Sequence, residues 1–400
     1  MNLIQGWLAD ARRHPDTRHV DTCDGVRALA ILIVAWYHIW QQSWLYPNLT
    51  LFGKDISFDP LVRSGYIWVD IMILISGFCL DLPWARLDEG ERGPSPLVLY
   101  EKRLARVHPS YLLAVAVMFG AALATNAYGE NRAFMLRDVV SHLTYTQMFT
   151  YDTYYATNLG GALWTLALEM QLYLLFPLLA RAFRRQPVLT FTAMVGLALA
   201  SRGYIAAAYY DVSLYFNQLP AYLDTFALGM AAALAHVKLA KARHGALMRL
   251  VCSGVTVAAL WLLWQTAKGQ AGCPNTEAIR MGQMNRRLMM GMLGAVLLTA
   301  SANAGWLVRH ILSNPVTRFV SAVSMQFYIW HQTIAVWLLK ARVIPSVCAN
   351  PNYEGDLLWQ KRYTFACFAV SLLAAAALTY GFDRPIARRL LQKKRENTAK

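Results

Sequence analysis

The chain has 400 residues, 56% of them hydrophobic and 15% charged, which is too apolar for an ordinary soluble protein. The net charge of +15 does not indicate nucleic-acid binding, because the basic residues lie between apolar runs and show no basic patch interleaved with aromatic residues. The apolar runs are about 18 to 22 residues long, the length that crosses the hydrocarbon core of a bilayer. We therefore predict a single-domain, all-α, polytopic integral membrane protein.

Residues 1–20 form a polar N-terminal segment, in which a short amphipathic piece from Asn2 to Ala11 precedes a stretch with three arginines. The first long apolar run begins only near Val26, and no small-residue cleavage site follows it. This run is therefore predicted to remain as the first transmembrane helix and not to be removed as a signal peptide.

The first apolar run carries one arginine and one histidine, Arg27 and His38. Ionisable side chains are costly inside a bilayer and usually have a function there. Their spacing of eleven residues places both side chains on nearly the same helix face, about 16 Å apart along the axis. We predict that the rest of the chain builds a reaction site around this face.

The hydropathy pattern predicts about ten transmembrane helices. Their approximate ranges are 26–45, 65–82, 108–125, 162–181, 188–208, 220–237, 247–267, 287–304, 316–339 and 363–382. Lys and Arg number 24 on the N-terminal side of these spans and 13 on the other side, which predicts that both termini are cytoplasmic. The basic tail, residues 383–400, is the clearest cytoplasmic marker.

The region from Asp138 to Gly161 is too polar and too rich in tyrosine to cross the membrane. We expect a half-helix and a loop on the outer side, because irregular backbone at this depth has to line protein or a wet cavity. Two interpretations of its aromatic side chains remain open. They stack on a sugar ring, or they form an interfacial aromatic belt.

Helix rise along each span sorts the ionisable residues into two predicted layers. The first lies in the outer half of the membrane and holds His38, Asp70, Glu169 and His331. The second lies at the cytoplasmic face and holds Arg27, Arg103, Arg106 and Arg384. Two layers indicate two substrates, or two parts of one substrate.

The residue types indicate the chemistry. A neutral imidazole at His38 can take a proton from a hydroxyl that attacks a carbonyl, with Glu169 or Asp70 as the orienting carboxylate. Arg103 and Arg106 are three residues apart on one helix face, and paired guanidinium groups suit phosphate oxygens. The alternatives are a structural histidine between helices and a plain positive-inside anchor at Arg106.

Several stretches together resemble the membrane-bound acyltransferase 3 family, which modifies surface polysaccharides and related acceptors. Those that resemble its motifs, in the same order, are residues 24–38 (Arg-x10-His), 69–78 (Val-Asp-Ile-Met-Ile-Leu-Ile-Ser-Gly-Phe), 102–111 (Arg-x-x-Arg-x-x-Pro-x-Tyr), 164–177 (Trp-Thr-Leu-Ala-Leu-Glu), 324–331 and 380–385. Three positions depart from the family pattern. Trp68 replaces a glycine, Met72 and Leu74 stand near aromatic positions, and Asp383 replaces a glutamate.

This resemblance implies ten helices and an acyl-coenzyme A donor, acetyl-coenzyme A first, with transfer to a hydroxyl of a glycan or lipid-linked sugar at a bacterial inner membrane. It implies that His38 is catalytic and that Arg27, Arg103 and Arg106 engage the donor. By the same resemblance, Trp164, Tyr173, Tyr328 and His331 contact substrate. No SGNH-type hydrolase domain is expected after the last span, unlike in fused members of the family.

Two other functions remain open at this stage. The buried histidines and carboxylates also suit a transporter or acyl-group exporter with a proton relay, although no internal repeat supports it. The same fold with succinyl-coenzyme A is another. The six cysteines lack metal-ligand spacing, so no metal is expected, and Cys273 and Cys348 are candidates for a disulfide on the outer side.

Overall fold

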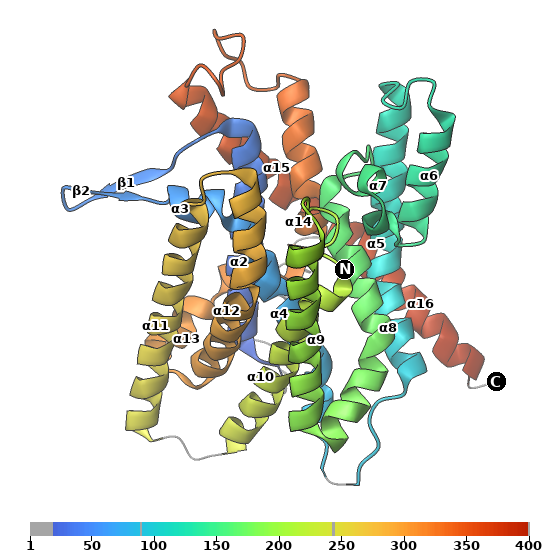
Figure 1. The fold of residues 1–400 in the computed structure, drawn as a ribbon, viewed down its shortest axis with the longest axis vertical. Helices are drawn as coiled ribbons and strands as arrows, with labels where there is room; N and C mark the ends of the chain where they lie inside the picture. Colours follow the sequence, from blue (N-terminus) through green and yellow to red (C-terminus); the bar gives the residue numbers. More distant parts are fainter. Residues whose placement is uncertain (1–18, 89, 242–244, 399–400) are drawn as a thin grey trace.

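The computed structural model describes residues 19–88, 90–241 and 245–398. The predicted amphipathic piece, Asn2 to Ala11, lies outside these residues. The described chain is a bundle of long helices, with short helices and one small hairpin at one end (Figure 1). The all-α, polytopic architecture expected from the sequence is confirmed.

The long helices follow the predicted spans with shifted ends. They are α2 (Asp21–Ser43), α4 (Val69–Ala85), α5 (Pro96–Ala124), α8 (Trp164–Arg185), α9 (Pro187–Ala208), α10 (Leu223–Lys241), α11 (Ala246–Ala271), α12 (Thr276–Asn303), α14 (Pro315–Lys340) and α15 (Leu357–Leu378). The 3-10 turns η1 (Gly65–Trp68), η3 (Gly161–Leu163) and η4 (Leu219–Tyr222) precede α4, α8 and α10, and α15 continues through η5 (Thr379–Asp383) into α16 (Arg384–Thr398).

Eight helices in the described part of the chain are long and apolar enough to cross a membrane, or nine if α12 and α13 (Trp306–Leu312), bent by 120°, form one span. The tenth expected span is α14, which has 26 residues but is not among these helices. Its polar side chains explain this difference. Ser321, Ser324, Gln326 and His331 are all buried inside the bundle.

The ends of α14 follow local sequence signals. The Asn314 side chain accepts hydrogen bonds from the first turn, Thr317 completes a capping box, and Pro315 occupies the first helical position. The helix ends at Lys340, where a loop begins that leads to α15. These signals fix how far α14 extends, and therefore the height at which His331 lies in the bundle.

Two glycines allow α4 and α10 to touch. A Cβ atom at Gly229 would lie 2.1 Å from the backbone oxygen of Leu74, and one at Gly77 would lie 2.5 Å from that of Phe226. Small residues at such positions let helix backbones approach closely, and side-chain packing then stabilises the pair. Of this tight pair, α4 also packs against α2, the helix that carries Arg27 and His38.

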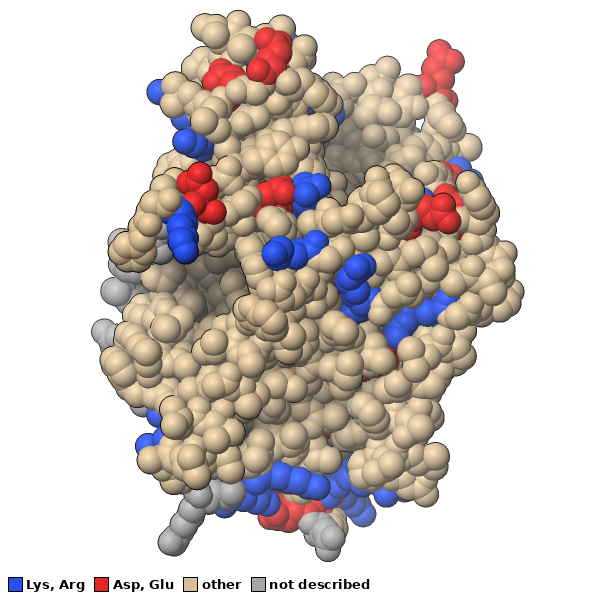
Figure 2. Space-filling view, turned by 60° about the vertical axis from the view of Figure 1, so that its left-hand side comes forward, with Lys and Arg blue, Asp and Glu red and all other residues tan. Residues whose placement is uncertain are grey.

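The two ends of the bundle differ. One end carries the hairpin of β1 (Asn48–Leu51) and β2 (Lys54–Ser57), the short helices α3 (Asp59–Arg63), α6 (Arg132–Leu143) and α7 (Tyr151–Tyr155), and the long α14–α15 loop (Figure 1). At the other end, Figure 2 shows Lys and Arg side chains gathered along the lower rim. The half-helix expected between residues 138 and 161 corresponds to the end of α6 and to α7.

The expected disulfide is not formed. Cys273 and Cys348 are both free thiols in the structure. Cys273 follows the end of α11, where its sulfur lies 3.8 Å from an Arg286 nitrogen, whereas Cys348 belongs to the α14–α15 loop. The two loops that were predicted to share one face therefore do not join through these residues.

Candidate functional site

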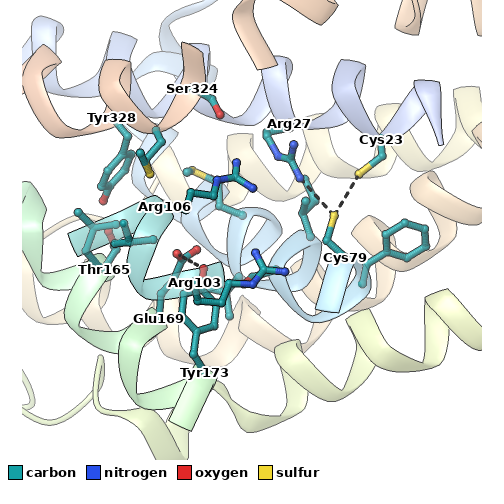
Figure 3. Close-up of a pocket in the computed structure, with 18 of the residues that line it drawn as sticks. Cys23, Arg27, Cys79, Arg103, Arg106, Thr165, Glu169, Tyr173, Ser324 and Tyr328 are labelled. Carbon is teal, nitrogen blue, oxygen red and sulfur yellow. Dashed lines mark hydrogen bonds between the residues drawn. The ribbon is translucent and has the colours of Figure 1, made fainter. Parts of the chain in front are cut away.

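A cavity of about 360 Å³ lies between α2, α4, α5, α8 and α14. Six of the ten predicted site residues line it, namely Arg27, Arg103, Arg106, Glu169, Tyr173 and Tyr328. Figure 3 shows the three guanidinium groups pointing into one space, with Glu169 and Tyr173 on the facing helix. We call this space the arginine cavity.

Arg27 is held at the junction of three helices. Its guanidinium donates to Ser321 Oγ of α14 at 3.3 Å and to Cys79 Sγ of α4 at 3.2 Å. Asp24, one turn earlier on α2, lies 3.8 Å from Arg27 and accepts a hydrogen bond from Ser321 at 2.7 Å. These contacts fix the position of the positive charge and leave part of the guanidinium facing the cavity.

Arg103 and Arg106 lie one turn apart on α5, which begins at Pro96, well before the predicted span at 108. Arg103 stacks over the Tyr173 ring, 5.3 Å from its centroid, and the Tyr173 hydroxyl donates to Glu169 at 2.7 Å. Within the described residues, neither guanidinium takes part in an ion pair. They are therefore available to an anionic ligand.

The mouth of the cavity holds His19, which lies before α2 and outside the membrane-spanning segments. Its Nε2 atom lies 2.6 Å from Asp24 Oδ2. This hydrogen bond raises the pKa of His19 above its usual value, although partial burial and the positive charge of Arg27 act against the rise. The mouth of the cavity thus carries a titratable group whose charged form is favoured by Asp24.

Sequence reasoning missed the thiol of Cys79. Its sulfur lies 4.0 Å from that of Cys23 and accepts from Arg27, and both cysteines line the arginine cavity (Figure 3). The signal that was available is the position of Cys79 in the sequence, directly after the Ser-Gly-Phe motif that ends at Phe78. The thiol offers a natural chemical reporter for occupation of the cavity.

His38 and His331 form a hydrogen-bonded pair across α2 and α14. His38 Nδ1 lies 2.8 Å from His331 Nε2, and His331 Nδ1 lies 2.8 Å from the backbone oxygen of Tyr328. A carbonyl oxygen only accepts, so His331 Nδ1 carries a proton and, in a neutral ring, its Nε2 accepts from His38. This arrangement leaves His38 Nε2 without a proton, as a base requires.

The pair lies beyond the arginine cavity, not inside it. Tyr328 lines the cavity and precedes His331 by three residues, so one helical turn separates the cavity from the buried partner of His38. Sequence reasoning placed both histidines in one layer but did not pair them with each other. It expected a carboxylate as the partner of His38.

The two carboxylates lie elsewhere. Asp70 is fully buried and pairs with Arg287 of α12 at 3.2 Å, and Glu169 lies in the arginine cavity with Tyr173. In the structure the hydrogen-bond partner of His38 is therefore His331, and not the predicted Asp70 or Glu169. Glu169 was predicted to lie in the outer layer with the histidines, but in the structure it lies beside Arg103 and Arg106 in the arginine cavity.

Arg287 was not singled out from the sequence, although it is completely buried. Its guanidinium lies over the Tyr222 ring, 3.7 Å from the centroid, and donates to Asn217 and to the Phe216 backbone oxygen. Arg287 lies at the start of an apolar run, a position that in the sequence alone is typical of a charged residue in a loop between two spans. The signal that was available is Asp70, a buried carboxylate that requires a cation.

Trp164 lies at the first position of α8, with its ring 6.0 Å from that of Tyr154 and 6.2 Å from that of Tyr222. It does not line the arginine cavity. Its neighbours place it between the outer loop region and the Arg287 cluster. The structure thus brings Trp164 to aromatic side chains of the bundle, apart from the predicted donor residues.

The tyrosine-rich region is organised by Asp138 of α6, which is buried outside the membrane-spanning segments. Its carboxylate accepts from the Tyr128 hydroxyl at 2.8 Å, from Thr157 at 2.8 Å and from the Asn158 backbone at 3.1 Å. Burial acts to raise the pKa of Asp138, but these bonds and the one from His142 outweigh it and lower the pKa. The region is therefore a built structure and not a loose loop.

Comparison with known proteins identifies one matching protein family and several relatives. A family model described as an acyltransferase domain matches residues 21–382. Nodulation protein 10 of Rhizobium leguminosarum is 28% identical over 211 residues, which cover 50% of this chain and 54% of that protein. The peptidoglycan O-acetyltransferase OatA of Listeria monocytogenes is 25% identical over 210 residues, 48% of this chain and 29% of that protein.

The O-acetyltransferase OatA of Staphylococcus aureus is 26% identical over 168 residues, 40% of this chain and 24% of that protein. The matches thus span about half or less of the length of these relatives. No solved structure matches the chain.

Proposed function

This chain belongs to the acyltransferase 3 family, and from that premise we propose that it moves an acyl group across the plane of a membrane. The donor is acyl-coenzyme A, acetyl-coenzyme A in the first instance, bound from the cytoplasm. The acceptor is a hydroxyl of a cell-surface glycan or lipid-linked sugar on the other face. The membrane is the bacterial inner membrane, with both termini in the cytoplasm.

The arginine cavity supports the donor half of this proposal. Coenzyme A carries several phosphate oxygens, and Arg27, Arg103 and Arg106 present guanidinium groups that grip such oxygens through charge-assisted hydrogen bonds. Tyr328 lines the cavity and lies one helical turn before His331. A thioester arm that enters beside the arginines is therefore directed toward the histidine pair.

The histidine pair supports the transfer step, and its hydrogen bond is the observation that carries the proposal. His38 Nε2 takes the proton of the acceptor hydroxyl as the oxygen attacks the thioester carbonyl. The C–S bond then breaks, and the coenzyme A sulfur leaves as a thiolate that accepts from His38 the proton of the acceptor hydroxyl. His331 acts as a positioning residue that holds the His38 ring and stabilises its charged form.

The test uses the full-length protein in lipid nanodiscs with acetyl-coenzyme A labelled on the acetyl group. We expect His38→Ala to lower transfer to an acceptor glycan by about a thousandfold, as loss of a general base does. Donor binding should persist, measured as protection of Cys79 from a maleimide. His310→Ala, which changes an exposed histidine, is the matched control and should keep full activity.

Undiminished transfer by His38→Ala would remove His38 from the reaction. Coupled transport by proteoliposomes without consumption of coenzyme A would instead favour the transporter alternative. Competition between acetyl- and succinyl-coenzyme A for protection of Cys79 decides the donor. Mass spectrometry of surface glycans from cells with and without the gene identifies the acceptor.

A further inference from the structure

A second cavity, of about 460 Å³, lies at the opposite end of α2 from His19. Its walls are the C-terminal ends of α2 and α14, the N-terminal end of α15 and the loop that joins α14 to α15, residues 341–356. This loop lies above the helix ends in Figure 1. We call this space the loop cavity.

The loop cavity lies above the histidine pair. Gln41 and Gln42 line it and follow His38 by three and four residues, which places them on the same face of α2, about 5 to 6 Å further along the axis. Leu338 and Leu339 line it from α14, two turns beyond His331. Both helices that carry the pair therefore lead into this cavity.

The loop that closes the cavity is held by its own hydrogen bonds. Ser346 donates to the Asp356 carboxylate at 2.7 Å, and the Asn350 backbone donates to Glu354 at 2.8 Å. Asn352 ties the loop to α2 through the Gln42 backbone oxygen at 3.3 Å. A loop of sixteen residues without regular structure that is fixed in this way is typical of a binding loop.

The side chains of the loop cavity suit a sugar. Gln41, Gln42, Asn350 and Asn352 bring amide groups, which both donate to and accept from hydroxyl and acetamido groups. Tyr353 lines the cavity at 71% exposure, and its ring centroid lies 5.1 Å from that of Trp44, which is 39% exposed. Exposed rings offer π faces to the C–H face of a pyranose ring.

An interfacial aromatic belt also exposes Trp and Tyr, but its rings anchor in the headgroup region of the bilayer. Here the ring pair adjoins a cavity whose other walls carry amides. Two cations, Lys340 and Arg342, also line the cavity, whereas the loop carboxylates Asp356 and Glu354 do not line it and accept hydrogen bonds within the loop. The charges that line the cavity therefore disfavour a sugar that carries a free ammonium group. The combination points to an N-acetylated sugar and away from its deacetylated form.

We propose that the loop cavity is the acceptor subsite and binds an N-acetylated pyranose of the glycan, next to the residue that is acylated. The proposal rests on the proposed function, because it assigns the acceptor side of the same reaction. Tyr353 and Trp44 hold the ring, and the amides of α2 and of the loop contact its polar groups. His38 then lies one turn below the bound sugar.

The first experiment uses two natural thiols of the unmodified protein in nanodiscs. Cys348 lines the loop cavity, whereas Cys273 lies after α11 and outside it, and both are free. Desolvation and the nearby Glu354 raise the pKa of Cys348, so maleimide labelling is followed in mildly alkaline buffer. The probes are the tetramer of N-acetylglucosamine and the same tetramer after deacetylation.

We expect the N-acetylated tetramer to slow labelling of Cys348 at least about threefold at saturation and to leave Cys273 unchanged. The deacetylated tetramer should protect neither thiol. Equal protection of both cysteines, or of Cys348 by both tetramers, would overturn the proposal. This measurement needs no turnover, so it gives an answer even if the proposed acyl transfer fails.

The second experiment uses variants. Tyr353→Ala should raise the KM for the acceptor about tenfold, the effect of losing one stacked ring, with kcat within about twofold and unchanged donor protection of Cys79. Tyr353→Phe should keep the wild-type KM. Tyr210→Ala, which removes a ring that is 95% exposed on the α9–η4 connection, is the matched control.

Equal effects of Tyr353→Ala and Tyr210→Ala on the acceptor KM would show that Tyr353 and Trp44 are part of an interfacial aromatic belt. That result would overturn the assignment. Thermal unfolding of each variant is measured together with the kinetics, because unfolding of the α14–α15 loop would raise the acceptor KM even if Tyr353 made no contact with the sugar. If the unchanged protein transfers acetyl but Cys348 is not protected, only the subsite is wrong. If Cys348 is protected but no acetyl is transferred, the proposed reaction is wrong.

Discussion

Two groups of arginines in the helix bundle differ in what surrounds them. Arg287 and Arg202 are buried in protein, where each pairs with a carboxylate, Asp70 and Asp224. Arg103 and Arg106 line a cavity and have no ion pair among the described residues. In the first group the protein itself supplies the opposite charge for each guanidinium. In the second group the cavity leaves space for a negatively charged ligand.

The difference teaches how to interpret a charge in an apolar run. Burial of a guanidinium group is costly, and the cost is offset only when hydrogen bonds and an opposite charge surround it. Arg287 meets this condition, with Asp70, Asn217 and the Tyr222 ring around it. Arg103 and Arg106 line the cavity without being buried in protein, so this cost does not apply to them. Their accessible charges, without an ion pair among the described residues, are what the proposed donor site requires.

The largest effect is expected for Arg287→Met. This change leaves Asp70 as a buried charge without its partner, so we expect a loss of about 3–5 kcal/mol in the free energy of unfolding. The measurement is the thermal unfolding of purified protein in detergent, together with the yield of folded protein. Activity should fall only in proportion to the folded fraction.

The double variant Arg287→Met with Asp70→Leu is the control for this prediction. Removal of both charges should restore part of the lost stability, because no buried charge is left unpaired. If Asp70→Leu alone abolishes transfer while the fold is intact, Asp70 has a role in the reaction and the comparison of the two groups fails.

The comparison also shows what the sequence could and could not predict. The all-α class and the order of the long helices follow from the apolar runs, whereas α14 and the start of α5 do not, because polar residues occupy them. The spacing of Arg103 and Arg106 predicts that they share one helix face. The partner of Asp70 could not be predicted, because Arg287 is 217 residues away and the contact depends on how α4 and α12 pack. The His38–His331 pair depends in the same way on the packing of α2 against α14.

His331 extends the comparison to a neutral side chain. It is fully buried like Arg287, but its hydrogen-bond partner is His38, the proposed base. We expect His331→Ala to lower kcat about a hundredfold, the cost of losing an orienting partner, with unchanged donor protection of Cys79. His331→Gln keeps an acceptor near His38 and should recover part of kcat. A fall in stability with unchanged kcat of the folded protein would make His331 structural.

The donor arginines should behave in the opposite way to Arg287. Arg103→Ala and Arg106→Ala are each expected to raise the donor KM about tenfold or more, the effect of one lost charge-assisted contact with phosphate. The thermal midpoint should change little, because no buried carboxylate loses a partner. Arg137→Ala, an exposed arginine on α6, is the control.

A high salt concentration offers a second check on the same pair. Added salt should weaken donor binding less in the variants than in the unchanged protein, since fewer charges attract the phosphates. An arginine that acts only as a membrane anchor would leave both the donor KM and its salt dependence unchanged.

The smallest effect is expected at His19, which lies at the mouth of the arginine cavity beside Asp24, with Asp21 and Arg27 nearby. Because the Asp24 hydrogen bond raises the pKa of His19 above its usual value, His19 keeps its proton to a higher pH than a free imidazole and loses it as the pH rises through that higher pKa. The positive charge, and its contribution to folding stability, are therefore present at low pH and lost at high pH. A negatively charged donor should bind less well as the proton leaves.

We expect the donor KM of the unchanged protein to rise about two- to threefold between about pH 6 and about pH 9, measured at constant ionic strength so that screening is fixed. His19→Gln should flatten this rise, with a KM near the high-pH value throughout, because it removes the titrating charge but keeps a hydrogen-bond donor for Asp24. An identical pH profile in the variant would show that the charge at the mouth does not act on the donor. The cavity arginines, which stay charged across this range, would then account for donor affinity without help from His19.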